Sequence, residues 1–187
     1  DLAVFAIEQA YQIEAMSVPD FVAGFVYGMT GDNHLSELEA CYTGGTDVVH
    51  DVQLAVTRIE YGSYIAGFAE IGKSIHEFPA ALTTCQNMDE DIAAIEEWAT
   101  IFTEPERLAK TLSKNWLLHR STIKEDLAKE QSDWAAGNFF QAGVDTALAL
   151  TEAVGPIETT NELSVDLMKI PDFVAGFVYG VTGDLEL

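Results

Sequence analysis

The stretch Gly67 to Ser74, GFAEIGKS, has the residue spacing of a phosphate-binding loop. In such a loop the lysine contacts the phosphates and the serine hydroxyl binds magnesium, and the loop must connect a buried strand to a helix. Here the intervening Phe-Ala-Glu-Ile favours a helix, Glu70 would lie against phosphate charge, and no apolar strand ending in a metal-binding aspartate follows. We therefore expect an ordinary helix over this stretch and no nucleotide site.

Asp47, His50 and Asp51 stand at positions i, i+3 and i+4, a helical spacing that suits a divalent cation. A chain so rich in acids presents such triplets by chance, and neither a His-Glu-x-x-His nor a calcium-loop pattern occurs. We expect a solvated helix face here, with no metal and no cofactor. The other histidines are scattered, and no Gly-x-Ser-x-Gly nucleophile pattern occurs, so we expect no enzyme.

The charge of the chain limits its partners. Its 187 residues include 9 Lys and Arg against 31 Asp and Glu, a formal net charge of -22. This charge disfavours nucleic acid and anionic lipid surfaces. The densest apolar stretch, Phe21 to Gly28, is far shorter than the roughly 18 residues of a membrane-spanning helix, so we expect no membrane insertion.

Apolar residues recur three and four positions apart rather than two, which predicts helices and no convincing strand. The clearest example runs over residues 106–136, where Leu108, Leu112 and Leu127 share one stripe with three further apolar residues. We predict an all-α fold, a multi-helix bundle or helical-repeat module of about eight to ten helices, with one long amphipathic helix near 106–136.

Six of the nine basic residues lie on this long helix, outside its apolar stripe. They are Arg107, Lys110, Lys114, Arg120, Lys124 and Lys129. A solvated face with local ion pairs would account for them. The alternative is that this basic face meets the acidic surface of another copy of the chain.

Fifteen residues of the chain occur twice. VPDFVAGFVYGMTGD at 18–32 and IPDFVAGFVYGVTGD at 170–184 are identical at thirteen positions, which amphipathic patterning alone does not produce. Aromatic residues that fill a pocket interleave with glycines that let another backbone approach. In the first copy these are Phe21, Gly24, Phe25, Tyr27 and Gly28, and in the second they are Phe173, Gly176, Phe177, Tyr179 and Gly180.

The offset of 152 residues between the copies predicts a repeat unit. Residues 1–17 would be a leading helix or linker from a preceding unit, 18–169 the all-α unit, and 170–187 the start of a second unit. Either the second copy begins the next unit of a longer chain, or it docks into the equivalent groove of a neighbouring chain. Both alternatives predict head-to-tail order.

The two cysteines, Cys41 and Cys85, permit either one disulfide in an oxidising compartment or two buried free thiols. Several short motifs resemble those of a group of uncharacterised secreted all-helical proteins of ciliates and similar protists. These motifs are Asp20-Phe-Val-Ala-Gly-Phe, Glu39-Ala-Cys41, Cys85-Gln-Asn-Met88, Trp98-Ala-Thr-Ile-Phe102 and Gly143-Val-Asp-Thr-Ala147. The resemblance covers roughly residues 19–158, and it implies a signal peptide on the precursor, a Cys41 to Cys85 disulfide and no assigned activity.

We therefore expect an extracellular structural repeat module that assembles head to tail with further copies of itself into a filament, coat or matrix. Phe21, Phe25 and Tyr27, with their second copies, would pack between units, and the basic face would set the register. The alternative is a secreted all-α binding module with an apolar cavity for a lipid or another small ligand.

Overall fold

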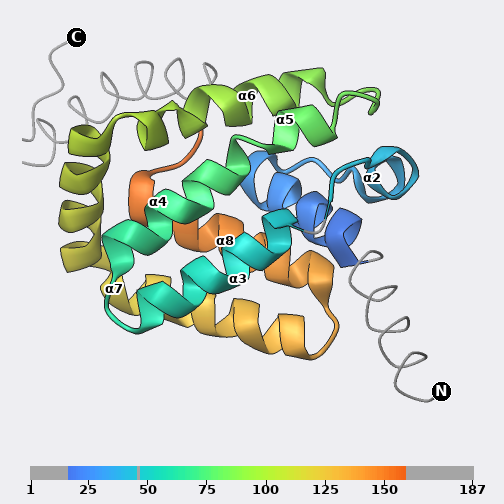
Figure 1. Cartoon of the computed structure of the whole chain (residues 1–187). Helices are drawn as coiled ribbons and strands as arrows, with labels where there is room; N and C mark the ends of the chain where they lie inside the picture. Colours follow the sequence, from blue (N-terminus) through green and yellow to red (C-terminus); the bar gives the residue numbers. More distant parts are fainter. Residues whose placement is uncertain (1–16, 46, 159–187) are drawn as a thin grey trace, which may run out of the picture. The chain divides into compact units, whose positions relative to one another are not determined.

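The computed structural model describes residues 17–45 and 47–158, and these are all-α (Figure 1). The chain is helical from residue 17 to residue 30. There follow α2 (Leu35–Cys41), α3 (Asp47–Glu60), α4 (Tyr64–Ile75), α5 (Phe78–Ala81), α6 (Asp89–Ala99), the 3-10 helix η1 (Thr100–Thr103), α7 (Pro105–Ala135) and α8 (Phe139–Val154). No strand occurs in the described residues, so the predicted fold class is confirmed.

The seven helices α2 to α8 are fewer than the eight to ten expected, and the helix at residues 17–30 brings the α-helices of the described residues to eight. Residues 82–88 run as turns and irregular chain between α5 and α6, and α5 itself has only four residues. The chain divides after Ile157, and the second part, from Glu158 onward, lies outside the described residues except for its first residue. The predicted unit boundary at 169 also lies outside them.

The long helix was predicted well. Helix α7 spans 31 residues, Pro105–Ala135, and begins with proline, whose fixed φ suits the first helical turn. The apolar stripe faces the interior, with Leu108, Leu112, Ile123 and Leu127 buried. The six residues of the basic face are all exposed.

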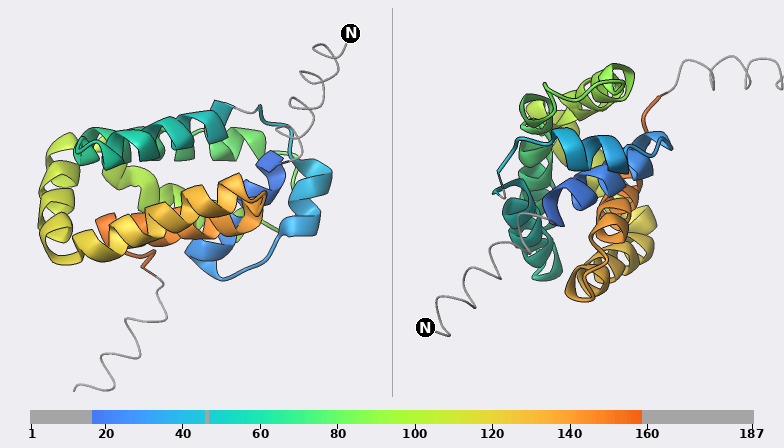
Figure 2. Two further views of the ribbon diagram at one scale, coloured as in Figure 1. Left: turned by 90° about the horizontal axis from the view of Figure 1, so that it is seen from below. Right: turned by 90° about the vertical axis from the view of Figure 1, so that its right-hand side faces the viewer.

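Two helix pairs, α3 with α4 and α7 with α8, pack side by side, and both views of Figure 2 show α7 (yellow) beside α8 (orange). The two pairs turn in the same way. Gly62 and Gly137 have φ of 93° and 81°, and the amide of the next residue reaches back five residues, from Ser63 and from Asn138, over 3.0 and 2.8 Å. This is the Schellman motif, in which glycine adopts the left-handed conformation without a steric cost.

Helix α4 contains the stretch whose letters match a phosphate-binding loop. Residues 67–74 are helical throughout, as predicted, and both glycines are buried. A Cβ on Gly67 would lie 2.8 Å from the carbonyl oxygen of Ala55 in α3, and one on Gly72 would overlap the ring of Phe102. The glycines of this stretch therefore serve close packing.

Cys41, the last residue of α2, and Cys85, in the irregular chain after α5, form a disulfide with their Cα atoms 5.1 Å apart. The hydroxyl of Thr84 donates a hydrogen bond of 2.7 Å to the carbonyl oxygen of Cys41. The pairing that the family resemblance implied is therefore present.

Candidate functional site

The first copy of the repeated segment lies inside the core. Its helix buries five side chains almost completely, with at most 1% of each exposed: Phe21, Val22, Ala23, Phe25 and Val26. A surface helix buries a single stripe, so the burial of nearly consecutive residues means that neighbours surround this helix. We call the space that residues 17–30 fill the slot. Figure 1 shows the slot helix (blue) near α8, and its ring contacts reach α5, α7 and α8.

Glycines bring the slot helix and α8 into backbone contact. A Cβ on Gly24 would overlap the carbonyl oxygen of Phe140, and a Cβ on Gly143 of α8 would in turn meet the backbone of the slot helix. A Cβ on Gly28 would lie 2.6 Å from the Cβ of Ala147. Two carbon atoms attract best at about 3.5 to 4.0 Å, so these positions admit no larger residue without a shift of the helices.

Aromatic rings fill the remaining space of the slot. Phe21 meets Trp134 of α7 edge to face at 5.8 Å, and Phe25 meets Phe78 of α5 in the same way at 5.3 Å. Tyr27 differs from both, because 41% of it is exposed. The predicted assembly residues of the first copy thus lie in the unit's own core, except for Tyr27 at its edge. The second-copy residues lie outside the described part of the chain: Phe173, Gly176, Phe177, Tyr179 and Gly180.

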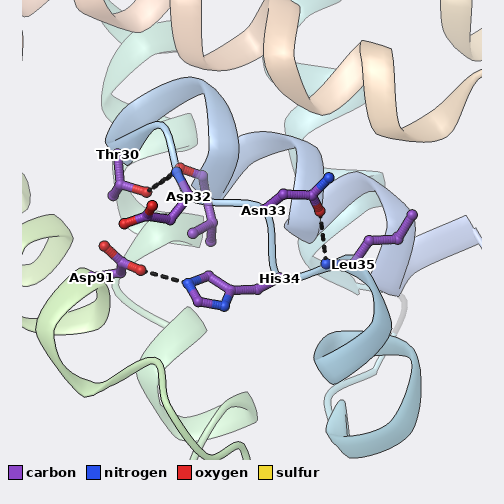
Figure 3. A network of polar contacts seen from close by, with 7 residues as sticks. Thr30, Asp32, Asn33, His34, Leu35 and Asp91 are labelled. Carbon is purple, nitrogen blue, oxygen red and sulfur yellow. Dashed lines mark hydrogen bonds and ion pairs between the residues drawn. The ribbon is translucent and has the colours of Figure 1, made fainter.

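The segment after the slot helix is tied to α6 (Figure 3). His34 Nε2 lies 2.6 Å from Asp91 Oδ2, and both side chains are largely buried. The side-chain oxygen of Asn33 accepts a hydrogen bond of 3.0 Å from the amide of Leu35 at the start of α2. The repeat ends just before these residues, and Glu186 stands where His34 would be. The second copy therefore lacks the histidine that makes this tie.

The second feature of the site is a group of buried acids on α7 and α8. Asp126, Glu130 and Asp145 are 7%, 0% and 3% exposed. One oxygen of Glu130 accepts a hydrogen bond from the amide nitrogen of Gln53 in α3, and Gln141 donates to Asp145 over 3.2 Å. The second carboxylate oxygen of Glu130 and that of Asp145 are buried without a hydrogen-bond partner. A buried carboxylate with an unsatisfied oxygen is costly in its charged form.

This cost is reflected in the acidity of the groups. Burial raises the pKa of Glu130 to about 7; the hydrogen bond from Gln53 opposes this rise, and the charges of Asp145 and Glu60 add to it. Burial likewise raises the pKa of Asp145 to about 6, with the neighbouring Asp133 adding to the rise. Desolvation and like charge both favour the neutral acid, so the two carboxyls hold protons at a pH where an exposed carboxyl has lost them.

Sequence reasoning did not predict this acid group. The signal was present on the long helix, because Asp126 and Glu130 stand three and seven residues after Ile123, at positions of the apolar stripe itself. An acid within a buried stripe indicates a hydrogen-bonded or proton-bearing carboxyl rather than a solvated face. Helix spacing alone could not predict that Gln53 of α3 would contact this group.

A pocket of about 280 Å³ opens beside the acid group. Its walls come from the start of the slot helix, from α3 and from the end of α7, and include Val18, Asp47, Val49, His50, Gln53 and Trp134. Two of the three residues weighed as cation ligands, Asp47 and His50, thus line one wall, and Asp51 does not. Among residues 17–45 and 47–158, no three or more His, Cys, Asp or Glu side chains are placed to hold a metal ion.

The basic face carries few local ion pairs. Arg107 lies 3.4 Å from Glu104, and Lys129 lies 3.0 Å from Glu125. Within the described residues the other four basic side chains of α7 make no ion pair: Lys110, Lys114, Arg120 and Lys124. Leu117 and Leu118, on the same exposed side of α7, are 84% and 67% exposed.

The sequence profile of the SctB-like family, described as secreted protein B-like, matches residues 4–150. The chain belongs to the SctB-like family. The predicted resemblance to a family of secreted proteins is thus confirmed. The match does not link the chain to ciliates or protists. Neither a curated protein nor a solved structure matches the chain. In the described part of this SctB-like protein, no helix combines the length and the apolar character needed to cross a membrane.

Proposed function

We propose that this SctB-like protein is an extracellular structural module whose units assemble head to tail through exchange of the slot helix. In this arrangement residues 170–184 fill, in an adjacent unit, the slot that residues 18–32 fill in their own. The observation that supports the proposal is the identity of the two segments at every residue that packs in the slot between Phe21 and Gly28. The two differences, Val18 against Ile170 and Met29 against Val181, exchange one apolar side chain for another.

The slot accepts only certain residue types at certain positions, and the second copy has the same residues there. The backbone of α8 leaves no room for a Cβ at Gly24, and the second copy has Gly176 at that position. The deep aromatic positions Phe21 and Phe25 likewise have counterparts in Phe173 and Phe177. A segment selected only for amphipathic character would have no reason to keep glycine at these points.

The slot and the segment proposed to fill it in a neighbour are different parts of the chain, so the contact between units would be heterologous. Such a contact closes into a ring or continues into a filament, depending on the rotation between units. A filament, coat or matrix is the product we propose. The unpaired cations of the basic face would then meet the acidic surface of a neighbour, because the chain has 31 acids against 9 basic residues.

The test uses the full chain with Phe173→Asp and Phe177→Asp together. If the second copy binds a neighbouring slot, these changes leave the unit folded, with unchanged circular dichroism, and abolish association measured by light scattering over a range of concentrations. The matched control is Asp184→Asn, which alters the counterpart of the exposed Asp32 and should associate like the unaltered chain.

A labelled peptide of residues 170–184 provides an independent measurement. It should bind the unaltered chain, and the same peptide with both phenylalanines replaced by aspartate should not. Association that persists in the double-aspartate chain would exclude the slot as the contact between units.

A further inference from the structure

The pocket beside the acid group has both polar and apolar side chains in its walls, and one wall is an aromatic ring. Val18 and Val49 are buried, and the Trp134 ring is held edge to face by Phe21 at 5.8 Å and by Phe139 at 4.9 Å. A ring held from two sides keeps its orientation without a ligand. The pocket therefore has a preformed aromatic wall, as small-molecule sites commonly do.

The hydrogen bond between Gln53 and the buried Glu130 determines which atom of Gln53 is left as an acceptor. Because the amide nitrogen of Gln53 donates to the fully buried Glu130, the amide oxygen of Gln53 is the atom left to accept a hydrogen bond. Asp47 adds a carboxylate, which only accepts when it is ionised. Gln53 and Asp47 stand six residues apart on α3, with His50 halfway between them on the same pocket wall. Gln53 and Asp47 thus each present an acceptor, which favours a ligand that brings donors.

We propose that this pocket binds a small organic ammonium ion, a primary amine carried on a short aromatic or apolar chain. An ammonium group brings three donors and one positive charge, which suit the acceptors of Asp47 and Gln53. A cation also gains from an indole face such as that of Trp134. The net charge of -22 raises the local concentration of cations around the whole molecule.

The volume restricts the size of the ligand. Pockets for drug-sized molecules span roughly 300 to 1,000 Å³, and this pocket, with about 280 Å³, lies just below that range. A compact amine fits this volume better than the acyl chain of a lipid. The slot helix contributes Val18 to the pocket, but the groups proposed to bind the amine lie outside the exchanged segment: Asp47 and Gln53 of α3, and Trp134 of α7. Binding of the amine therefore does not require assembly.

The test is isothermal titration calorimetry of the full chain with 2-phenylethylamine at pH 8 and low ionic strength. We expect saturable binding at one site, together with a shift of the Trp134 indole signal in the NMR spectrum. The neutral isostere 2-phenylethanol should bind at least about tenfold more weakly, since it lacks the charge-assisted hydrogen bond.

Asp47→Asn should weaken binding of the amine by at least about tenfold, because it removes the charged acceptor from an exposed position at the start of α3. The matched control is Asp51→Asn, which makes the same change of charge one helical turn away, outside the pocket, and should leave the affinity unchanged. Gln53→Met should weaken binding without removing the charge of Asp47.

Three outcomes would overturn the proposal. They are the absence of saturable heat with 2-phenylethylamine, equal affinity for the alcohol, and equal losses in the Asp47 and Asp51 variants. The last outcome would mean that the amine responds only to the overall charge of the molecule.

Discussion

His34, which follows the first copy of the repeated segment, has its Nε2 atom 2.6 Å from Oδ2 of Asp91 in α6, 57 positions later in the chain. The contact joins the segment that follows the slot helix to a helix outside the repeat (Figure 3). The second copy has Glu186 in place of His34, so in the proposed exchange this contact would favour the unit's own helix over the copy.

His34→Ala should therefore loosen the slot helix and increase exchange. We expect the free energy of unfolding to fall by about 2 kcal/mol, in the range of a hydrogen bond to a charged group. The fraction of associated chains in sedimentation velocity should rise at constant concentration. His76→Ala, at an exposed position, is the control and should change neither quantity. Unchanged stability of the His34 variant would contradict the role assigned to this contact.

The helix crossing at Gly24 gives a second prediction. Gly24→Ala places a Cβ against the carbonyl oxygen of Phe140, so we expect a loss of about 1 to 3 kcal/mol in chemical denaturation. Gly45→Ala, where the nearest atom outside the adjoining residues lies 3.9 Å from the added Cβ, should stay within about 0.5 kcal/mol of the unaltered chain. Gly176→Ala should leave unit stability unchanged and weaken association. A destabilised Gly176 variant that still associates would show that the second copy does not use this crossing.

The buried acids predict how stability depends on pH. Since the pKa of Glu130 is raised to about 7 from 4.5, the folded state binds more protons than the unfolded state between these values. Stability should therefore fall as pH rises from about 4.5 to 7, by about 3 kcal/mol for Glu130 alone, and Asp145 contributes in the same direction over its own range up to about 6. The groups that face Glu130 are Gln53 and Glu60 of α3 and Asp145 of α8. None of them is a cation that would offset the negative charge of an ionised Glu130.

Glu130→Gln tests this dependence, because it removes the titrating group at nearly constant volume. The variant should be more stable than the unaltered chain at pH 8 and should show a flatter profile between pH 5 and 8 in thermal unfolding. Glu96→Gln, on the exposed surface of α6, should keep the original profile. If the Glu130 variant kept the original pH profile, Glu130 would be ruled out as the source of the pH dependence of stability.

The disulfide predicts the effect of reduction. Cys41 and Cys85 are 44 positions apart, and a cross-link over a loop of this length restricts the unfolded chain by about 4 kcal/mol. Cys41→Ser with Cys85→Ser should lower the free energy of unfolding by an amount of this order in urea titrations. Reductant should destabilise the unaltered chain and leave the double variant unaffected. A double variant as stable as the oxidised chain would show that the cross-link adds nothing to the folded unit.

The sequence predicted those features that depend on neighbours along the chain. Helical spacing of leucines gave α7 to within one residue at each end, and the helix-forming residues between Gly67 and Gly72 gave α4 in preference to a phosphate-binding loop. The family resemblance gave the cysteine pairing. The helix predictions succeeded because helix propensity and amphipathic period are local properties that a single segment carries by itself.

The sequence by itself thus determined the helices, the repeated segment and the excess of acids. Only the tertiary structure decided that the first copy lies inside the core, and that Gln53 meets Glu130 across 77 positions. It also decided that Asp47 and His50 share a pocket wall with Trp134. The physical reason is that packing of α3, the slot helix, α7 and α8 depends on which faces meet, and the period of each helix gives its buried face without naming the partner of that face.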